Sequence, residues 1–200
     1  MNNIILYSLS SYIIGSMSGS LLLGKFWKID IRKFGSNSAG GTNAFRTVGF
    51  TFGLLTAIID ILKGLLPAYF IGYLSGQNEL QMMICGFSAI FGHVFPVFYQ
   101  FNGGKGAGTT VGALIILAPE SLIYVLPTFI IVSVLSGFVG LGTITAAFVL
   151  LIYSIIMLHI NFVWFSLSIL LFIIFTHRKN IQRMISGDEN QFSKIMIFKR

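Results

Sequence analysis

Charged residues are scarce in this sequence. Asp, Glu, Lys and Arg together make up 10% of the 200 residues, against about 25% in a typical soluble domain. Apolar residues make up 55%, and 20 residues are phenylalanine. So few charges cannot cover a water-soluble surface, which excludes a soluble globular fold, intrinsic disorder and a coiled coil. The single cysteine, Cys85, excludes an intrachain disulfide scaffold. We therefore expect one membrane-embedded domain over residues 1–200.

Three long runs contain no charged residue at all, namely 1–24, 80–104 and 121–177. About 20 apolar residues cross the hydrocarbon core of a bilayer, so the last run can hold up to three crossings. The first run lacks the basic segment of a cleaved signal peptide and is expected to be a transmembrane helix. The sequence thus predicts an all-α, polytopic integral membrane protein with about seven transmembrane helices, over 4–26, 51–74, 81–101, 106–118, 120–136, 143–159 and 162–177. A count of five results if some of these are merged or dropped.

The basic residues predict how the chain is oriented in the membrane. Either odd count of helices places the termini on opposite sides. With the N-terminus outside, 12 of the 13 Lys and Arg residues fall in the internal segments 25–50, 102–110, 137–142 and 178–200, and the thirteenth is Lys63. This bias predicts a cytoplasmic C-terminus and short cytoplasmic loops. The net charge of +7 is then mainly a topology signal, and we expect no nucleic-acid binding because no recognition motif accompanies it.

Glycine is abundant, with 22 residues, and clusters in the internal segments 35–43, 103–110 and 136–143. A glycine-rich loop that leads into a helix can bind anions through its free amides. The cluster around Lys105 has this form, although a flexible turn with a topogenic lysine fits equally well. A Walker A loop is excluded, because positions 99 and 106 are Tyr and Gly. Two other pairs, Gly15/Gly19 and Gly108/Gly112, have the spacing that lets membrane helices pack closely.

A few ionisable residues lie inside the predicted helices. Asp60 and Lys63 share one helix face and can pair, either as a functional group or as a neutralised structural contact. His93, ten residues before the second glycine cluster, is either a helix–helix hydrogen bonder or a functional residue. It lies far in sequence from His159 and His177, and no Cys or carboxylate stands at metal-ligand spacing, so we expect no metal.

Four motifs together point to a known family. The first reads roughly Gly-Ser-Gly-Asn-x-Gly-Ala-Thr-Asn-x-x-Arg, and the residues here that match it are Gly35, Ser36, Gly40, Thr42, Asn43 and Arg46. The second is Gly-His-x-x-Pro followed by Gly-Gly-Lys-Gly-Val-Ala-Thr, matched by Gly92, His93, Pro96, Gly103, Gly104, Lys105, Gly106 and Thr109. The stretch 60–64 and a His-x-x-Asn-Ile pattern at His177, Asn180 and Ile181 complete the set. Over nearly its whole length the chain resembles the bacterial acyl-phosphate:glycerol-3-phosphate acyltransferases, the PlsY family.

This resemblance implies a seven-helix acyltransferase of the bacterial cell membrane with a cytoplasmic active site. It would transfer a fatty acyl group from acyl phosphate to the 1-hydroxyl of glycerol 3-phosphate, without a cofactor, and would be linked functionally to the enzyme that forms acyl phosphate. The catalytic residues would be Lys105, Arg46, His93 and Ser36. The substrate-binding residues would be Gly35, Gly40, Thr42, Asn43, Gly103, Gly104, Gly106, Thr109, His177 and Asn180. The proton of the attacking hydroxyl would go to the departing phosphate or to a histidine.

Several positions depart from the family pattern. Asn37 and Ser38 stand in place of Gly and Asn, Gly41 in place of Ala, Gly140 in place of an expected serine, and Lys179 in place of a frequent Glu. At the Gly140 position, Thr143 or a water molecule could supply the missing hydroxyl. Two alternatives to the acyltransferase remain: a small transporter for an anionic metabolite, and a diverged paralogue of low activity or altered donor preference.

Overall fold

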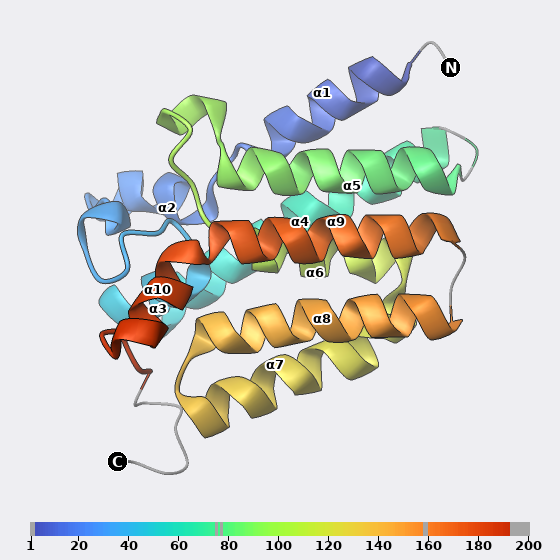
Figure 1. Ribbon diagram of the computed structural model, residues 1–200. Helices are drawn as coiled ribbons and strands as arrows, with labels where there is room; N and C mark the ends of the chain where they lie inside the picture. The colour runs from blue at the N-terminus through green and yellow to red at the C-terminus, as the bar shows by residue number, and fades with distance from the viewer. Residues whose placement is uncertain (1–2, 75, 77, 158–159, 193–200) are drawn as a thin grey trace. The chain divides into compact units, whose positions relative to one another are not determined.

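The computed structural model describes residues 3–74, 76, 78–157 and 160–192, and these residues are helical with short connections (Figure 1). Their contacts group the chain into two compact units, Met1–Ala118 and Pro119–Arg200. The all-α class expected from composition is confirmed. That residues 1–200 act as one domain stays a prediction. The prediction that His159 binds no metal concerns a residue outside the described ranges.

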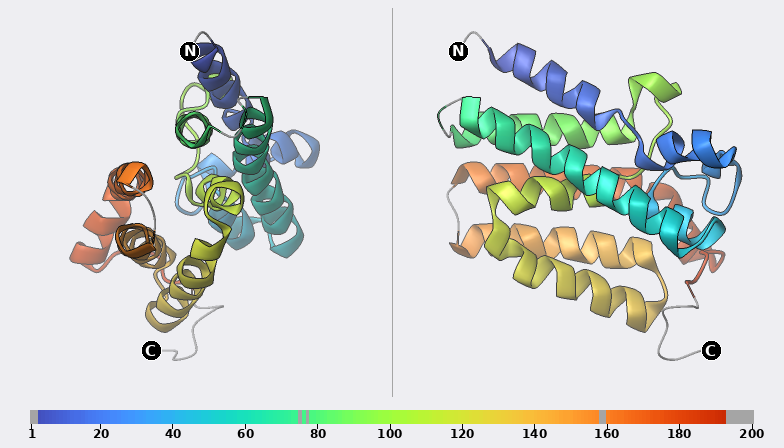
Figure 2. Two further views of the ribbon diagram at one scale, coloured as in Figure 1. Left: turned by 90° about the vertical axis from the view of Figure 1, so that its right-hand side faces the viewer. Right: turned by 180° about the vertical axis from the view of Figure 1, so that it is seen from behind.

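In the first unit, the long helix α4 (Phe50–Leu74) contacts all the other α-helices. Figure 2 shows α1 alongside α5, and both views agree on this pairing. The other helices of the unit are α1 (Ile4–Gly15), α2 (Gly19–Trp27), α3 (Gly41–Thr47), α5 (Glu79–Val94) and α6 (Ala107–Leu117), with short 3-10 turns at Ile31–Lys33 and Val97–Tyr99.

Small residues let the helices of this unit approach one another closely. Gly15 of α1 packs on the backbone of Ala89 in α5, and Gly112 of α6 packs on the carbonyl of Ile61 in α4, with no space for a Cβ at either glycine. Van der Waals packing of this kind is the main attraction between helices in lipid. The predicted role of the glycine pairs in helix packing is confirmed at these positions.

In the second unit, α8 (Val139–Met157) contacts both α7 (Leu122–Ser136) and α9 (Ile160–Thr176), and α10 (Arg178–Ser186) contacts α8 and α9. A 3-10 turn, Pro119–Ser121, precedes α7. The hydroxyls of Ser154 and Ser166 form a hydrogen bond of 2.6 Å between α8 and α9. This bond satisfies two buried polar groups that lipid could not.

The described residues contain five stretches long and apolar enough to cross a membrane. They are Ile4–Trp27, Phe50–Ile71, Glu79–Tyr99, Pro119–Ser136 and Val139–Met157. A sixth results if α9 and α10, which meet at a bend of 55°, form one span, and α6 is apolar but short. The polytopic membrane architecture is confirmed, and the predicted seven helices each match a helical stretch, so seven is approximate as a count of crossings.

Two predicted segments differ from the structure. The helix expected over 4–26 is broken between Gly15 and Gly19, because Ser18 is extended and the backbone groups at the break bond to side chains of α4 instead. The third glycine cluster, expected as a loop over 137–142, is mostly helix, since α8 begins at Val139. A glycine is required at position 142 because α8 packs there on Ser133 and Phe129 of α7, with no room for a side chain.

Candidate active site

The first motif forms a loop that folds around the buried side chain of Asn43 in α3. The Asn43 amide nitrogen donates to the carbonyls of Ile31, Phe34 and Ser38, each at 3.0 Å. Its amide oxygen accepts from the backbone N–H of Ser36 at 3.0 Å. The Asn43 side chain is thus bonded to the backbone of the loop at four points.

Two residues of this loop have left-handed backbone conformations. Gly35 has φ +60° and lies against the Asn43 amide, which excludes a side chain there. Asn37 has φ +56°, a conformation that Asn tolerates better than other non-glycine residues. Its side chain also donates to the Arg32 carbonyl at 2.8 Å. Asn37 can therefore hold this left-handed conformation at the position where the family has Gly.

The remaining first-motif residues surround this loop. Ser36 lies half-buried within it, Gly40 precedes the first turn of α3, Thr42 is exposed in that turn, and Arg46 lies in the last turn, partly buried. Gly41 has its nearest atoms at 3.6 Å from where a Cβ would be, so the family's Ala would also fit.

The second motif folds back on the end of α5. The backbone N–H groups of Gly103 and Gly104 donate to the carbonyls of Val94 and His93 at 3.2 and 3.1 Å. The Gly104 Cα lies against Nε2 of the His93 imidazole, with no space for a Cβ. Lys105 follows, partly buried, and leads directly to the N-terminus of α6.

Gly106 and Thr109 connect this loop to the packed helices. Gly106, with φ +94°, is the N-cap of α6 and its carbonyl accepts from the Thr110 hydroxyl at 2.9 Å. Thr109 is fully buried, and its carbonyl lies against Gly64 of α4. The two residues therefore hold the start of α6 in place.

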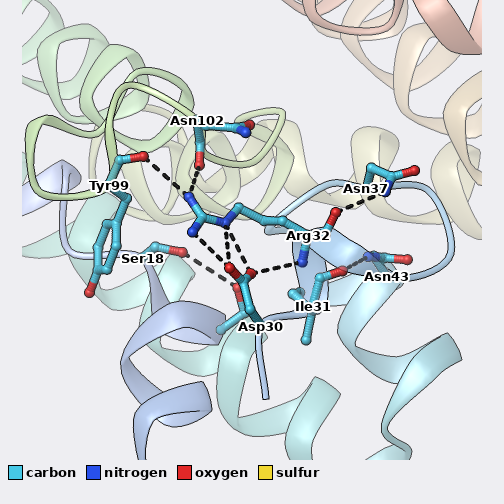
Figure 3. Close-up of polar contacts among 9 residues, drawn as sticks. Ser18, Asp30, Ile31, Arg32, Asn37, Asn43, Tyr99 and Asn102 are labelled. Carbon is cyan, nitrogen blue, oxygen red and sulfur yellow. Dashed lines mark hydrogen bonds and ion pairs between the residues drawn. The ribbon is translucent and has the colours of Figure 1, made fainter. Parts of the chain in front are cut away.

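The structure brings the first two motifs together. The backbone N–H of Ala39 donates to the carbonyl of Gly103 at 3.2 Å. Arg32 adds a second link, because its Nη1 donates to the carbonyls of Tyr99 and Asn102 at 3.2 and 3.4 Å (Figure 3).

Asp30 holds the Arg32 guanidinium in this bridging position. Its carboxylate lies 2.8 Å from Nη2 of Arg32 and also accepts from Nε and from the Arg32 backbone N–H (Figure 3). The hydrogen bond from Arg32 lowers the pKa of the Asp30 carboxyl below its ordinary value. Sequence reasoning treated Arg32 only as a topology signal and did not consider Asp30; an acidic residue two positions before a basic one is too common to reveal such a link.

Asp60, Lys63 and His93 form a buried cluster beside the second motif. Lys63 Nζ lies 3.0 Å from Asp60 Oδ1, which confirms the predicted pairing, and His93 Nδ1 lies 3.4 Å from the same oxygen. All three side chains are almost completely buried. Both edges of the His93 ring thus face protein groups, with Asp60 at Nδ1 and Gly104 at Nε2.

The second unit holds the tail motif. The amide nitrogen of Asn180 donates to Glu189 Oε1 at 2.7 Å, and Glu189 Oε2 accepts from Arg183 Nε at 2.7 Å. His177 Nδ1 lies 2.9 Å from the carbonyl of Ile173. Sequence reasoning missed Glu189, whose position after a glycine turn gave no separate signal.

Gly140 of α8 faces these tail residues. A Cβ at Gly140 would lie 3.3 Å from the Asn180 Cβ and 3.4 Å from the His177 ring, so a serine there would stand beside both. The hydroxyl of Thr143, considered as a replacement, donates to the Val139 carbonyl of its own helix at 2.9 Å.

Within the described residues, no group of three or more His, Cys, Asp and Glu side chains could hold a metal ion.

The fold and the motifs together define a polytopic membrane protein in which glycine-rich loops hold a lysine at a helix N-terminus. This arrangement suits the binding of phosphate groups.

Comparison with known proteins identifies the family. The family model described as glycerol-3-phosphate acyltransferase matches residues 5–187, so the chain belongs to this family and is an acyltransferase enzyme of the membrane. It is 39% identical over 194 residues to the glycerol-3-phosphate acyltransferase of Finegoldia magna, covering 96% of this chain and 97% of the relative. It is also 39% identical to glycerol-3-phosphate acyltransferase 2 of Bacillus anthracis over 188 residues, covering 94% and 98%.

Two solved structures share the fold. Both are crystal structures of PlsY (YgiH), an integral membrane glycerol 3-phosphate acyltransferase. The glycerol 3-phosphate form has a TM-score of 0.89 at 28% identity, covering 95% of this chain and 96% of the other. The lysophosphatidic acid form has a TM-score of 0.85 at 27% identity, covering 94% and 95%. The predicted family and acyl-transfer function are confirmed, and the transporter alternative finds no support in these matches.

Proposed function

We propose that the protein transfers a fatty acyl group from acyl phosphate to the 1-hydroxyl of glycerol 3-phosphate, giving lysophosphatidic acid and inorganic phosphate. The observation that carries this proposal is the junction of the two glycine-rich motifs at Ala39 and Gly103, which brings the loop that carries Lys105 beside the first motif. The glycerol 3-phosphate and lysophosphatidic acid forms of the related PlsY structures correspond to a substrate and a product of this reaction.

Lys105 and Arg46 are the cations that we assign to the phosphate groups. The Lys105 ammonium would act as a point charge near the start of α6, where the amides of the first turn can also bind a phosphate. Arg46 can bind a phosphate through two parallel hydrogen bonds. Together they would orient the phosphates and stabilise negative charge that develops as the acyl carbon is attacked.

The chemical step needs no covalent enzyme intermediate, because acyl phosphate is already activated. The glycerol hydroxyl oxygen forms a bond to the acyl carbon, and the bond from that carbon to the phosphate oxygen breaks. We propose that the departing phosphate accepts the hydroxyl proton. This choice follows from His93, which is buried and has Asp60 at one ring nitrogen and Gly104 at the other.

The other motif residues have supporting parts in this proposal. One wall of the proposed phosphate site would be formed by the first-motif residues Gly35, Ser36, Gly40 and Thr42. Asn43 would hold this wall in shape through its contacts to the loop backbone. Gly103, Gly104, Gly106 and Thr109 would shape the Lys105 loop. His177 and Asn180 are assigned to substrate binding by their match to the tail motif.

We further propose that the reaction takes place at the cytoplasmic face of the bacterial cell membrane, with the N-terminus outside. The basic residues of the internal segments support this orientation. It would let the protein receive acyl phosphate from the enzyme that forms it. A C-terminal epitope tag should be cleaved by added protease in inverted membrane vesicles and protected in right-side-out vesicles.

The direct test is turnover by the purified protein in lipid, supplied with acyl phosphate and glycerol 3-phosphate. We expect lysophosphatidic acid and phosphate in equal amounts, and a loss of at least about 100-fold in kcat/KM for Lys105→Met. Lys33→Met removes one exposed positive charge from the same unit and should retain activity. Binding of both substrates without product would point to the diverged, inactive paralogue.

A further inference from the structure

The break between α1 and α2 leaves backbone groups without helical hydrogen-bond partners inside a stretch that is long and apolar enough to span a membrane. Two side chains of α4 satisfy them: Asp60 Oδ1 accepts from the N–H of Gly19 at 3.3 Å, and Lys63 Nζ donates to the carbonyl of Met17 at 3.1 Å. A non-helical backbone at membrane depth requires such partners, because lipid offers none. The ion pair therefore stabilises the break.

The same carboxylate oxygen also lies beside the second motif. Its distance to His93 Nδ1 is 3.4 Å, and the other edge of that ring lies against Gly104. The His93 carbonyl in turn accepts from the Gly104 N–H at 3.1 Å. A continuous series of contacts thus leads from the helix break through Asp60 and His93 to the residue before Lys105.

The start of α6 lies against the same turn of α4. Gly108 of α6 has the Asp60 Cβ at 3.4 Å from where its own Cβ would be, and Gly64, next to Lys63, lies against the Thr109 carbonyl. Both ends of the loop between α5 and α6 are therefore held by the turn of α4 that carries the ion pair.

Stability alone does not account for this pair. Asp60 and Lys63 are 2% and 4% exposed, and the desolvation of two such charges offsets most of their mutual attraction. Neutral polar side chains could bond the two backbone groups at the break without this desolvation of charge. Intramembrane charges are thus expected to serve function.

We propose that Asp60, paired with Lys63, is a positioning residue for the second motif. Asp60 orients the His93 ring, the ring limits where Gly104 can lie, and the position of Gly104 decides where the Lys105 ammonium is directed. Lys63 neutralises the carboxylate and anchors it to the helix break. This inference rests on the proposed phosphate-binding part of Lys105, and it gives Asp60 and Lys63 no direct contact with substrate.

Two doubly substituted proteins separate positioning from charge neutralisation. Asp60→Asn with Lys63→Met removes both charges but retains an oxygen that can accept from Gly19 and face His93. Asp60→Leu with Lys63→Met removes both charges and that oxygen. Each single variant leaves one buried charge unpaired and should unfold at a lower temperature than either double variant. Glu79→Gln, an exposed carboxylate in the first turn of α5, is the matched control.

We expect the Asn/Met protein to keep kcat/KM within about threefold of the wild type and the Leu/Met protein to lose at least about tenfold, since small misplacements of a binding group reduce rates strongly. The proposal is overturned if a folded Leu/Met protein has wild-type kinetics, or if the Asn/Met protein is equally impaired. Should the Leu/Met protein not fold, Asp60→Ser with Lys63→Met replaces it, because a serine hydroxyl can bond within its own helix.

A second measurement does not depend on turnover. Inorganic phosphate should raise the unfolding temperature of the wild-type and Asn/Met proteins, and this rise should be much smaller in the Leu/Met protein. A wild type that forms no lysophosphatidic acid would contradict the proposed function but would leave this comparison of phosphate binding valid. Equal stabilisation of all three proteins by phosphate would contradict the positioning role.

Discussion

The imidazole of His93 occupies the space into which a side chain on Gly104 would extend, with Nε2 lying directly against the glycine. This contact joins the end of α5 to the loop that carries Lys105. Gly104→Ala should therefore displace either the ring or the loop and lower kcat/KM by at least about tenfold. Steady-state kinetics in lipid, with the unfolding temperature measured in parallel, would check this.

Gly108→Ala is the matched control for that variant. It lies four residues further on, in α6, and its Cβ would meet the Asp60 Cβ at 3.4 Å, an ordinary contact. Gly108 is the second residue of α6, where the helix-interior preference for Ala over Gly applies only in part, so this variant should be about as stable as the wild type. Equal activity losses in both variants would contradict the specific importance of the His93–Gly104 contact.

Asn43→Asp should disrupt the first motif. A carboxylate cannot donate to the three carbonyls that the Asn43 amide now bonds, and a buried carbonyl left without a donor costs about 1–3 kcal/mol. We expect a lower unfolding temperature, loss of most activity and faster proteolysis within 34–40. Asn37→Gly restores the family residue at a position with φ +56° and should stay within about threefold of wild-type activity.

The Asp30–Arg32 pair should make stability depend on pH. The pKa of the Asp30 carboxyl is lowered in the folded protein by its hydrogen bond with Arg32, so its contribution is present above the ordinary carboxyl pKa of about 4 and disappears as pH falls through the lowered value. The pair is partly exposed, so the contribution is below about 1 kcal/mol. The difference in unfolding temperature between wild type and Asp30→Asn should be seen at pH 7 and vanish in acid.

Arg32→Met provides the control for this pH dependence. Without the guanidinium, Asp30→Asn should have little further effect on the unfolding temperature at pH 7. A pH-dependent difference that persists in the Arg32→Met background would show that another group causes it.

Glu189→Gln should impair the tail motif. The Glu189 carboxylate accepts from both Asn180 and Arg183, whereas a glutamine oxygen can replace only one of its two acceptors and its amide would face the other donor. We expect kcat/KM to fall by about tenfold and the unfolding temperature to decrease. Asp188→Asn changes the neighbouring, exposed carboxylate and should leave both values unchanged.

Local patterns were sufficient for several conclusions. The uncharged runs predicted the membrane-spanning helices because hydration of the backbone and of charges is unavailable in hydrocarbon. The pairing of Asp60 with Lys63 followed from helical spacing alone. The glycine motifs with Lys105 and Arg46 identified the family before any coordinates, because their spacing along the chain is specific.

Other features depend on residues that are distant in sequence. The break after Gly15 could not be predicted, since its backbone groups bond to Asp60 and Lys63, more than 40 residues away. The bridge from Arg32 to Tyr99 spans 67 residues, and the lack of space for a side chain at Gly142 is set by Ser133 and Phe129 of the neighbouring helix α7. No local propensity carries this information.

The sequence by itself determined that this protein is a multi-pass membrane acyltransferase with glycine-rich phosphate motifs, since composition and motif spacing are properties of the chain alone. Only the tertiary structure decided that Asn43 supports a loop, that Arg32 joins two motifs, and that the buried Asp60 reaches both a helix break and the His93 ring. The physical reason is that buried polar groups must find partners, and which partner is in reach depends on how the helices pack.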